Sequence, residues 1–220
     1  MKKFLIINAS ANIQGSFSRR LSEYFVGKLD VPAYDYDICF RDLADIPIPH
    51  ISQNWIDADR KPAIQRNVQD REELRMSDSL IDELRRADII VIASPMYNWS
   101  IPSNLKAYLD QVIRLNETFT IGSKEEGIRY SGLLKNKILY LLLSRGSRGY
   151  GKGERNEQMD FQGPYLKMAF GIMGIRTIFE MVINGTNRND KELEREFIGV
   201  QEQIDIRLKA ESGNARSQDF

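Results

Sequence analysis

Two short runs of residues that are apolar at consecutive positions constrain the fold of this chain most strongly. They are IIVIAS at residues 89–94 and KILYLLLS at residues 137–144. A strand that is apolar on both faces is buried on both faces, which is typical of the centre of a parallel sheet. Because parallel strands are joined by crossovers, we expect helices between these strands and on both faces of the sheet.

The remainder of the chain supplies the other elements of such a sheet. FLII at residues 4–7 predicts a first strand, and Leu21, Phe25 and Leu29 form one apolar stripe of a helix over residues 16–29. Residues 33–43 alternate apolar and polar side chains, which predicts a half-exposed edge strand. We expect one more strand at residues 176–183 and an irregular segment at 45–61. Further helices are expected at 62–87, 160–173 and 190–210, and another is expected to begin with Ser103 as its N-cap and to continue through Leu115.

Five strands that alternate with helices predict an α/β fold: a three-layer sandwich around a five-stranded parallel sheet. The length of 220 residues suits one domain, which we place at residues 1–211. The polar residues 212–220 are expected to form a frayed tail. The strand order that we expect is 2-1-3-4-5, which puts the ligand-binding edge at the loops after strands one, three and four.

The composition argues against several classes of function. Lys and Arg number 31, as do Asp and Glu, so there is no basic field for nucleic acid or an anionic membrane. Cys39 and His50 are the only residues of their types, so neither a disulfide framework nor a Cys/His zinc site can form within one chain, and no metal is expected. No apolar run approaches membrane-spanning length, and we expect a cytoplasmic protein.

The loop after the first strand has the composition of a phosphate site. Ser10, Ser16 and Ser18 surround Gly15 directly before a helix, where free backbone N–H groups and hydroxyls bind phosphate. Ser16 as a simple helix cap is the alternative. The G-x-G-x-x-G pattern is absent, which favours a mononucleotide over a dinucleotide.

The other two loops also carry unusual chemistry. Tyr97, Asn98 and Trp99 follow the central strand and suit a planar heteroaromatic ring, although the two aromatics are equally suited to packing. Residues 146–153, GSRGYGKG, nearly match the phosphate loop of nucleotide hydrolases, but Gly153 replaces the hydroxyl that binds magnesium. We interpret this segment as a glycine-rich active-site loop.

Together, SPMYNWSIPSNLKAYLD at residues 94–110, the serine loop and LLLSRG at residues 141–146 resemble the FMN-dependent NADH azoreductase and quinone reductase family of flavodoxin-like proteins. RDLADIPIP and GPYLKMAFGIMGI are supporting stretches. The resemblance implies that FMN contacts Ser10, Ser16, Phe17 and Ser18 at its phosphate end, Met96, Tyr97, Asn98 and Trp99 at its ring, and Ser144, Arg145, Gly146 and Ser147 on the other side of the ring.

The resemblance also implies an activity. Two electrons would pass as hydride from NADH or NADPH to FMN and then, in a ping-pong sequence, to a quinone or azo compound, with Arg145 as an electrostatic aid. It further implies a homodimer whose sites are roofed by the partner, with Trp55, Tyr150 and Phe161 as candidate roof residues. An electron carrier of the flavodoxin type and a non-catalytic flavin-binding paralogue are the alternatives. Residues 118–137 are longer than the usual family turn and have Ile121 where an aromatic is frequent.

Overall fold

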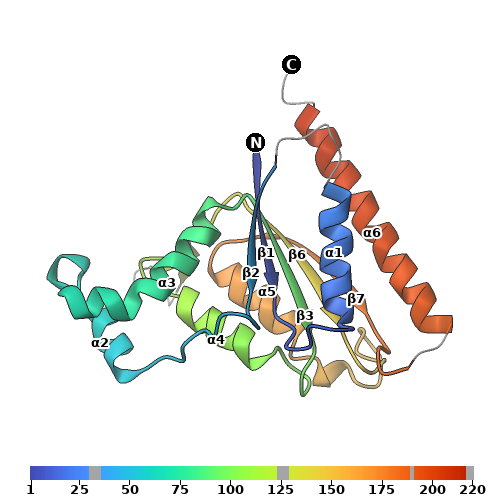
Figure 1. The fold of residues 1–220 in the computed structure, drawn as a ribbon, viewed down its shortest axis with the longest axis horizontal. Helices are drawn as coiled ribbons and strands as arrows, with labels where there is room; N and C mark the ends of the chain where they lie inside the picture. Colours follow the sequence, from blue (N-terminus) through green and yellow to red (C-terminus); the bar gives the residue numbers. More distant parts are fainter. Residues whose placement is uncertain (30–35, 123–128, 189–190, 217–220) are drawn as a thin grey trace.

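A computed structural model describes residues 1–29, 36–122, 129–188 and 191–216, with only the backbone of 212–216. Its centre is a sheet of five parallel strands in the order β2-β1-β3-β6-β7 (Figure 1). The strands are β1 (Lys2–Asn8), β2 (Tyr36–Asp42), β3 (Ile89–Pro95), β6 (Ile138–Ser144) and β7 (Thr177–Ile183). The parallel sheet and its edge strand β2 are therefore as predicted.

Helices cover both faces of this sheet (Figure 1). On one face lie α1 (Phe17–Leu29) and α6 (Lys191–Arg216), and on the other α3 (Val68–Arg86), α4 (Ser103–Val112) and α5 (Gly163–Ile172). A further helix, α2 (Gln53–Arg60), packs against α3. None of the helices, over the residues described, combines the length and the apolarity that a membrane span requires.

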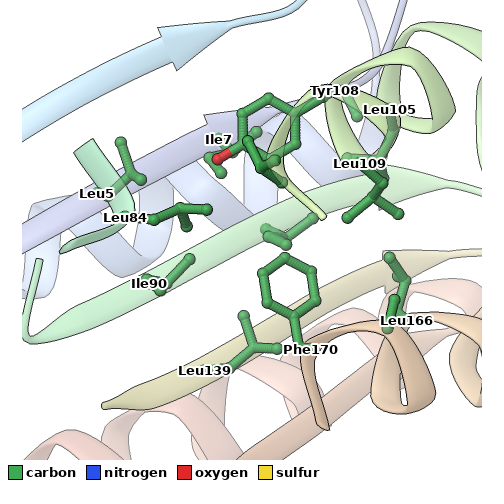
Figure 2. Close-up of a cluster of buried hydrophobic side chains, with 14 of the residues drawn as sticks. Leu5, Ile7, Leu84, Ile90, Leu105, Tyr108, Leu109, Leu139, Leu166 and Phe170 are labelled. Atoms are coloured by element: carbon green, nitrogen blue, oxygen red, sulfur yellow. The ribbon is translucent and has the colours of Figure 1, made fainter. Parts of the chain in front are cut away.

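Alternate residues of the central strands pack into two separate cores, one on each face of the sheet, which explains why the sequence of these strands is continuously apolar. In β1, Phe4 and Ile6 pack under α1 and α6, whereas Leu5 and Ile7 pack on the opposite face. Figure 2 shows this second core, in which Phe170 and Leu166 of α5 lie among residues of the strands and of the other helices: Leu5, Ile7, Leu84, Ile90, Leu105, Tyr108, Leu109 and Leu139.

The numbering of the sheet differs from the expected 2-1-3-4-5 because two short strands intervene in the sequence. These are β4 (Phe119–Ile121) and β5 (Tyr130–Gly132), which form an antiparallel sheet of their own. They lie within residues 118–137, the stretch that the sequence analysis singled out. Ile121 pairs with Tyr130 at the end of β4 and is half exposed.

Several predicted boundaries were wrong. The segment 45–61 contains helix α2, which begins where the Ser52 side chain accepts a hydrogen bond from the Trp55 N–H at 3.1 Å. Ser103 is the first residue of α4 rather than its cap, because Pro102 occupies the N-cap position. The same helix ends at Val112, so Leu115 lies beyond it and is 44% exposed.

The remaining helices also begin or end away from the predicted limits. A capping box between Asn67 and Asp70 starts α3, and a 3₁₀ turn (Ala63–Gln65) precedes it. At the other end of the chain, α6 continues to Arg216, so helix covers part of the segment predicted to be frayed. Residues 217–220 of that segment, like residues 33–35 of the predicted edge strand, lie outside the described residues. The single domain over residues 1–211 stays a prediction.

Candidate active site

Three loops meet at the carboxyl edge of the sheet, because the strands that precede them are neighbours. β1 pairs with β3, and β3 pairs with β6. Backbone hydrogen bonds continue these pairings into the loops: the Ala9 N–H donates to the Ala93 carbonyl at 2.9 Å, and the Met96 N–H donates to the Ser144 carbonyl at 2.7 Å. The site residues predicted from the first, third and fourth core strands therefore lie at one edge.

The serine loop forms a buried cluster of hydroxyls at the start of α1. Ser10, Ser16 and Ser18 are 1%, 6% and 0% exposed. The hydroxyls of Ser16 and Ser18 lie 3.1 Å apart, and the Ser16 hydroxyl also accepts from the Arg19 N–H at 3.4 Å, as an N-cap does. The N–H groups of Phe17 and Ser18 have no acceptor among the described residues. The loop therefore fits a phosphate, which would supply acceptors to these donors.

The two arginines that follow do not add free cations to this site. Arg19 is buried, and its guanidinium binds both carboxylate oxygens of Asp42 and donates to the Ser10 carbonyl at 2.7 Å. Arg20 instead stacks on the rings of Phe17 and Phe197, with its guanidinium carbon 5.1 and 4.4 Å from their centroids. Donors for an anion are therefore hydroxyls and backbone N–H groups.

Phe17 points its ring away from the serine cluster. Together with Arg20 and residues from the start of α6, it lines a groove of about 780 Å³ between α1 and α6. The ring packs edge-on against Phe197, with centroids 6.4 Å apart. Of the four predicted phosphate-end residues, Phe17 can therefore contribute only through its backbone.

The ion pair of Arg19 with Asp42 predicts an acid-sensitive contribution to stability. The hydrogen bonds from Arg19 lower the pKa of the Asp42 carboxyl below its ordinary value of 3.8. Because the unfolded chain then binds more protons, this contribution is present above about pH 4 and is lost as the pH falls through the folded-state pKa. When the free energy of unfolding is measured with urea between about pH 5 and pH 2, it should depend less on pH in Asp42→Asn than in wild type. An equal pH dependence in the two proteins would contradict this.

The loop after β3 folds into a tight turn that exposes two aromatic side chains. Tyr97 and Ser100 exchange backbone hydrogen bonds of 2.9 and 3.0 Å, and Asn98 and Trp99 between them have φ values of 46° and 65°. Positive φ at both central positions is the signature of a type I′ turn, which asparagine tolerates and tryptophan disfavours. Tyr97 is 38% exposed and Trp99 is 49% exposed. These rings are therefore not ordinary core residues.

This turn also offers unused donors. The N–H groups of Asn98 and Trp99 have no acceptor within the described parts of the chain. Backbone donors next to exposed aromatic surface fit the edge and the face of a planar heteroaromatic ring. Backbone strain at a residue such as Trp99 persists where the surroundings impose it, most often at functional sites.

The strain at Trp99 can be measured separately from its ring. Trp99→Ala and Trp99→Gly both remove the ring, but only glycine adopts positive φ without steric conflict. We expect the free energy of unfolding of the glycine variant to be about 1 kcal/mol higher than that of the alanine variant. Urea unfolding of the two proteins measures this difference. A glycine variant that is the less stable of the two would show that residue 99 is not strained.

Arg145, directly after β6, is bonded to residues of the 160–162 segment. Arg145 is 5% exposed; its guanidinium donates to Asp160 at 2.8 Å and to Gln162 at 3.2 Å, and lies 5.5 Å from the ring centroid of Tyr150. Its positive charge is thus already paired within the protein. Ser144 is buried, and the carbonyl of Gly146 accepts from the Asn187 N–H at 3.2 Å. In place of a phosphate-loop helix, residues 154–162 contain only a 3₁₀ turn (Glu157–Met159).

The candidate roof residues differ in how accessible they are. Trp55 is 9% exposed and donates its ring N–H to Gln111 at 3.0 Å, and Tyr150 is also 9% exposed. Phe161, by contrast, is 60% exposed, and its N–H donates to the Trp99 carbonyl at 3.0 Å. Only Phe161 of the three is placed to meet a molecule outside the chain at this site. His50, the single histidine, is exposed.

Sequence reasoning missed three residues that organise the site: Asp42, Asp160 and Gln162. Each is a polar side chain in or beside a loop, and no periodicity or motif spacing marks it. Their role follows only from the partners that the fold brings to them, which are Arg19 for Asp42 and Arg145 for the other two.

Comparison with known proteins relates the whole chain to one group. Residues 2–205 match a family model described as a flavodoxin-like fold. FMN-dependent NADH:quinone oxidoreductase 2 of Pseudomonas fluorescens (strain Pf-5) is 38% identical over 85% of this chain and 89% of that protein. FMN-dependent NADH:quinone oxidoreductase 3 of Pseudomonas aeruginosa is 34% identical over 96% and 95% of the two chains.

A solved structure supports the same fold. The FMN-dependent NADH-azoreductase from Bacillus anthracis, determined in complex with FMN, superposes with a TM-score of 0.81 over 93% of this chain and 98% of that chain. At 23% sequence identity, this likeness shows the fold alone.

Proposed function

The chain belongs to the flavodoxin-like family of FMN-dependent NADH:quinone oxidoreductases, and we propose that it moves two electrons from NADH or NADPH to quinones by way of bound FMN. Azo compounds are a second class of acceptor for the same chemistry. The observation that carries the proposal is the meeting of the buried serine cluster and the exposed type I′ turn at one sheet edge.

The residues have separate roles in this proposal. The hydroxyls of Ser10, Ser16 and Ser18 and the N–H groups at the start of α1 hold the FMN phosphate. The turn of Met96, Tyr97, Asn98 and Trp99 supports the flavin ring and donates from its backbone to the ring edge. Ser144, Arg145, Gly146 and Ser147 line the other side, where Arg145 acts by fixing the loop.

FMN, when bound, supplies the hydride chemistry that links the nicotinamide to the acceptor. The protein has to position the two substrates in turn and to hold fixed donors at the ring edge, where negative charge develops. The exposed rings of Tyr97, Trp99 and Phe161 leave apolar surface at this edge for a flat acceptor. No acid–base pair of side chains is required, which agrees with a chain that has one histidine.

Two further features belong to the proposal and follow from the family resemblance. One is a homodimer in which the partner completes each site. The other is a cytoplasmic location, where NADH and NADPH are available. The exposed Phe161 beside Trp99 supports a partner or a substrate at this place.

The visible spectrum of the purified protein tests the cofactor and the reaction together. We expect flavin bands after incubation with FMN, bleaching on addition of NADH or NADPH, and recovery of the bands with benzoquinone. Steady turnover with quinone and no protein partner would also exclude the electron carrier and the non-catalytic paralogue. A protein that stays colourless with FMN would refute the proposal.

A further inference from the structure

We propose that Gln162 is a positioning residue for the flavin site, an inference that rests on the proposed function. It is 0% exposed and occupies the N-cap position of α5, where its side chain makes no capping bond. Its amide N–H donates to the Ser94 carbonyl at 3.1 Å, and its amide oxygen accepts from the Arg145 guanidinium at 3.2 Å. One side chain thus joins the ends of β3 and β6.

These two strand ends carry the two loops that we assign to the flavin ring. Ser94 lies two residues before Met96, the first of the proposed ring-contacting residues, and Arg145 is itself one of the proposed site residues on the opposite side. At this edge β3 and β6 are already joined by their ladder, in which Ser94 lies opposite Leu143 and Pro95 opposite Ser144, and by the bond from the Met96 N–H to the Ser144 carbonyl at 2.7 Å. The Gln162 side chain therefore adds a side-chain link to the backbone ladder that joins the two sides of the site.

The backbone on either side of Gln162 strengthens this tie. Asp160 accepts from the N–H groups of Gln162 and Gly163 at 3.0 and 3.2 Å, and from Arg145 at 2.8 Å. Phe161 donates from its N–H to the carbonyl of the strained Trp99. Segment 160–163 therefore contacts the type I′ turn through its backbone and both strand ends through its side chains.

Gly163 shows how closely this segment is packed. A Cβ atom at that position would lie 2.2 Å from a carboxylate oxygen of Glu180 and 3.3 Å from Arg145. The absence of a side chain at Gly163 thus lets the segment approach Glu180 and Arg145 closely. We expect loss of the Gln162 amide to affect the Trp99 turn, because the neighbouring Phe161 N–H donates to the Trp99 carbonyl.

Replacement of Gln162 by leucine keeps the volume and removes both bonds. It removes one donor from the Ser94 carbonyl, which also belongs to the ladder with β6, and leaves the Arg145 Nε–H without its acceptor, which loosens the turn that presents donors to the ring. Because these donors stabilise the electron-rich reduced flavin more than the oxidised flavin, reduced FMN should lose more affinity. We expect oxidised FMN to bind about tenfold more weakly and reduced FMN about 100-fold more weakly.

The experiment compares Gln162→Leu with wild type and with a matched control. Gln111→Leu is the control, because Gln111 is also buried and also bridges two groups, the Trp55 ring N–H and the Pro49 carbonyl, but lies away from the site. FMN titration gives the affinity, and reduction against a reference dye gives the potential. A tenfold difference between redox forms lowers the two-electron potential by about 30 mV.

The outcomes separate this inference from the proposed function. A weaker, lower-potential flavin in Gln162→Leu, with wild-type values in Gln111→Leu, supports the inference. Wild-type affinity and potential in Gln162→Leu overturn it, as do equal losses in both variants, which would indicate general destabilisation. A wild-type protein that binds no FMN would overturn the proposed function and the inference with it.

Discussion

Replacing Ser18 with aspartate is expected to weaken FMN binding by at least about 100-fold, because a carboxylate would lie where the phosphate is proposed to bind. Juxtaposed like charges in a site of this kind are unfavourable by several kcal/mol, and each 1.4 kcal/mol is about a factor of ten in affinity. Ser18 is fully buried, and its hydroxyl contacts that of Ser16 at 3.1 Å. The guanidinium of the neighbouring Arg19 does not offset the added charge, since it is already paired with Asp42.

The folded state should survive this substitution. A carboxylate in the first turn of a helix is stabilised by the helix dipole and can accept from the unused N–H groups there, which offsets the cost of burying it. Titration with FMN and with riboflavin, which has no phosphate, measures the effect on the phosphate end alone. We expect riboflavin to bind the variant and the wild type alike.

The neutral substitution Ser18→Asn is the matched control, since it has the size of aspartate without the charge. It should weaken FMN binding far less than Ser18→Asp. If FMN affinity falls equally in both variants, the size of the side chain rather than its charge causes the loss, and the proposed phosphate position is wrong. Equal loss of riboflavin would point to a disturbed fold.

The fold was predictable because its evidence lies in local patterns. Continuous apolar residues at 89–94 and 137–144 require a sheet buried on two faces, and both segments are central strands. The helix α2 was missed because it has eight residues, two of which, Trp55 and Ala58, are buried. Apolar residues at helical spacing over only one or two turns, within a segment rich in Pro and Asp, are too weak a signal to predict a helix.

The site was predictable only in part, for a different reason. The sequence indicates that serines and aromatics gather at loops, but it does not indicate what the neighbouring charges do. Arg145 was expected to serve a ligand, yet Asp160 engages it within the protein, and Asp42 likewise engages Arg19 beside the serine loop. Such pairings join residues 23 and 15 positions apart through tertiary structure, so no spacing rule finds them.

A second large effect is expected at Arg114, whose side chain is fully buried beside the end of α4. It donates to Asp59 of α2 at 2.8 Å and to Ser77 and Asp78 of α3 at 2.9 and 2.6 Å. Its guanidinium carbon also lies 5.6 Å from the ring centroid of Trp55. One residue therefore ties α2 and α3 to the segment that follows α4.

Arg114→Met should lower the free energy of unfolding by about 3 kcal/mol, the lower end of the range for breaking a buried ion pair. The lower end applies because Asp59 and Asp78 have 23% and 54% of their side chains exposed and can regain water. Urea unfolding measures the loss, and Trp55 emission, read in a Trp99→Phe background, reports local loosening. Arg114→Lys keeps the charge without the planar fork and should lose less. Equal or greater stability of Arg114→Met would show that apolar packing replaces the ion pairs, and that Arg114 does not hold α2 in place.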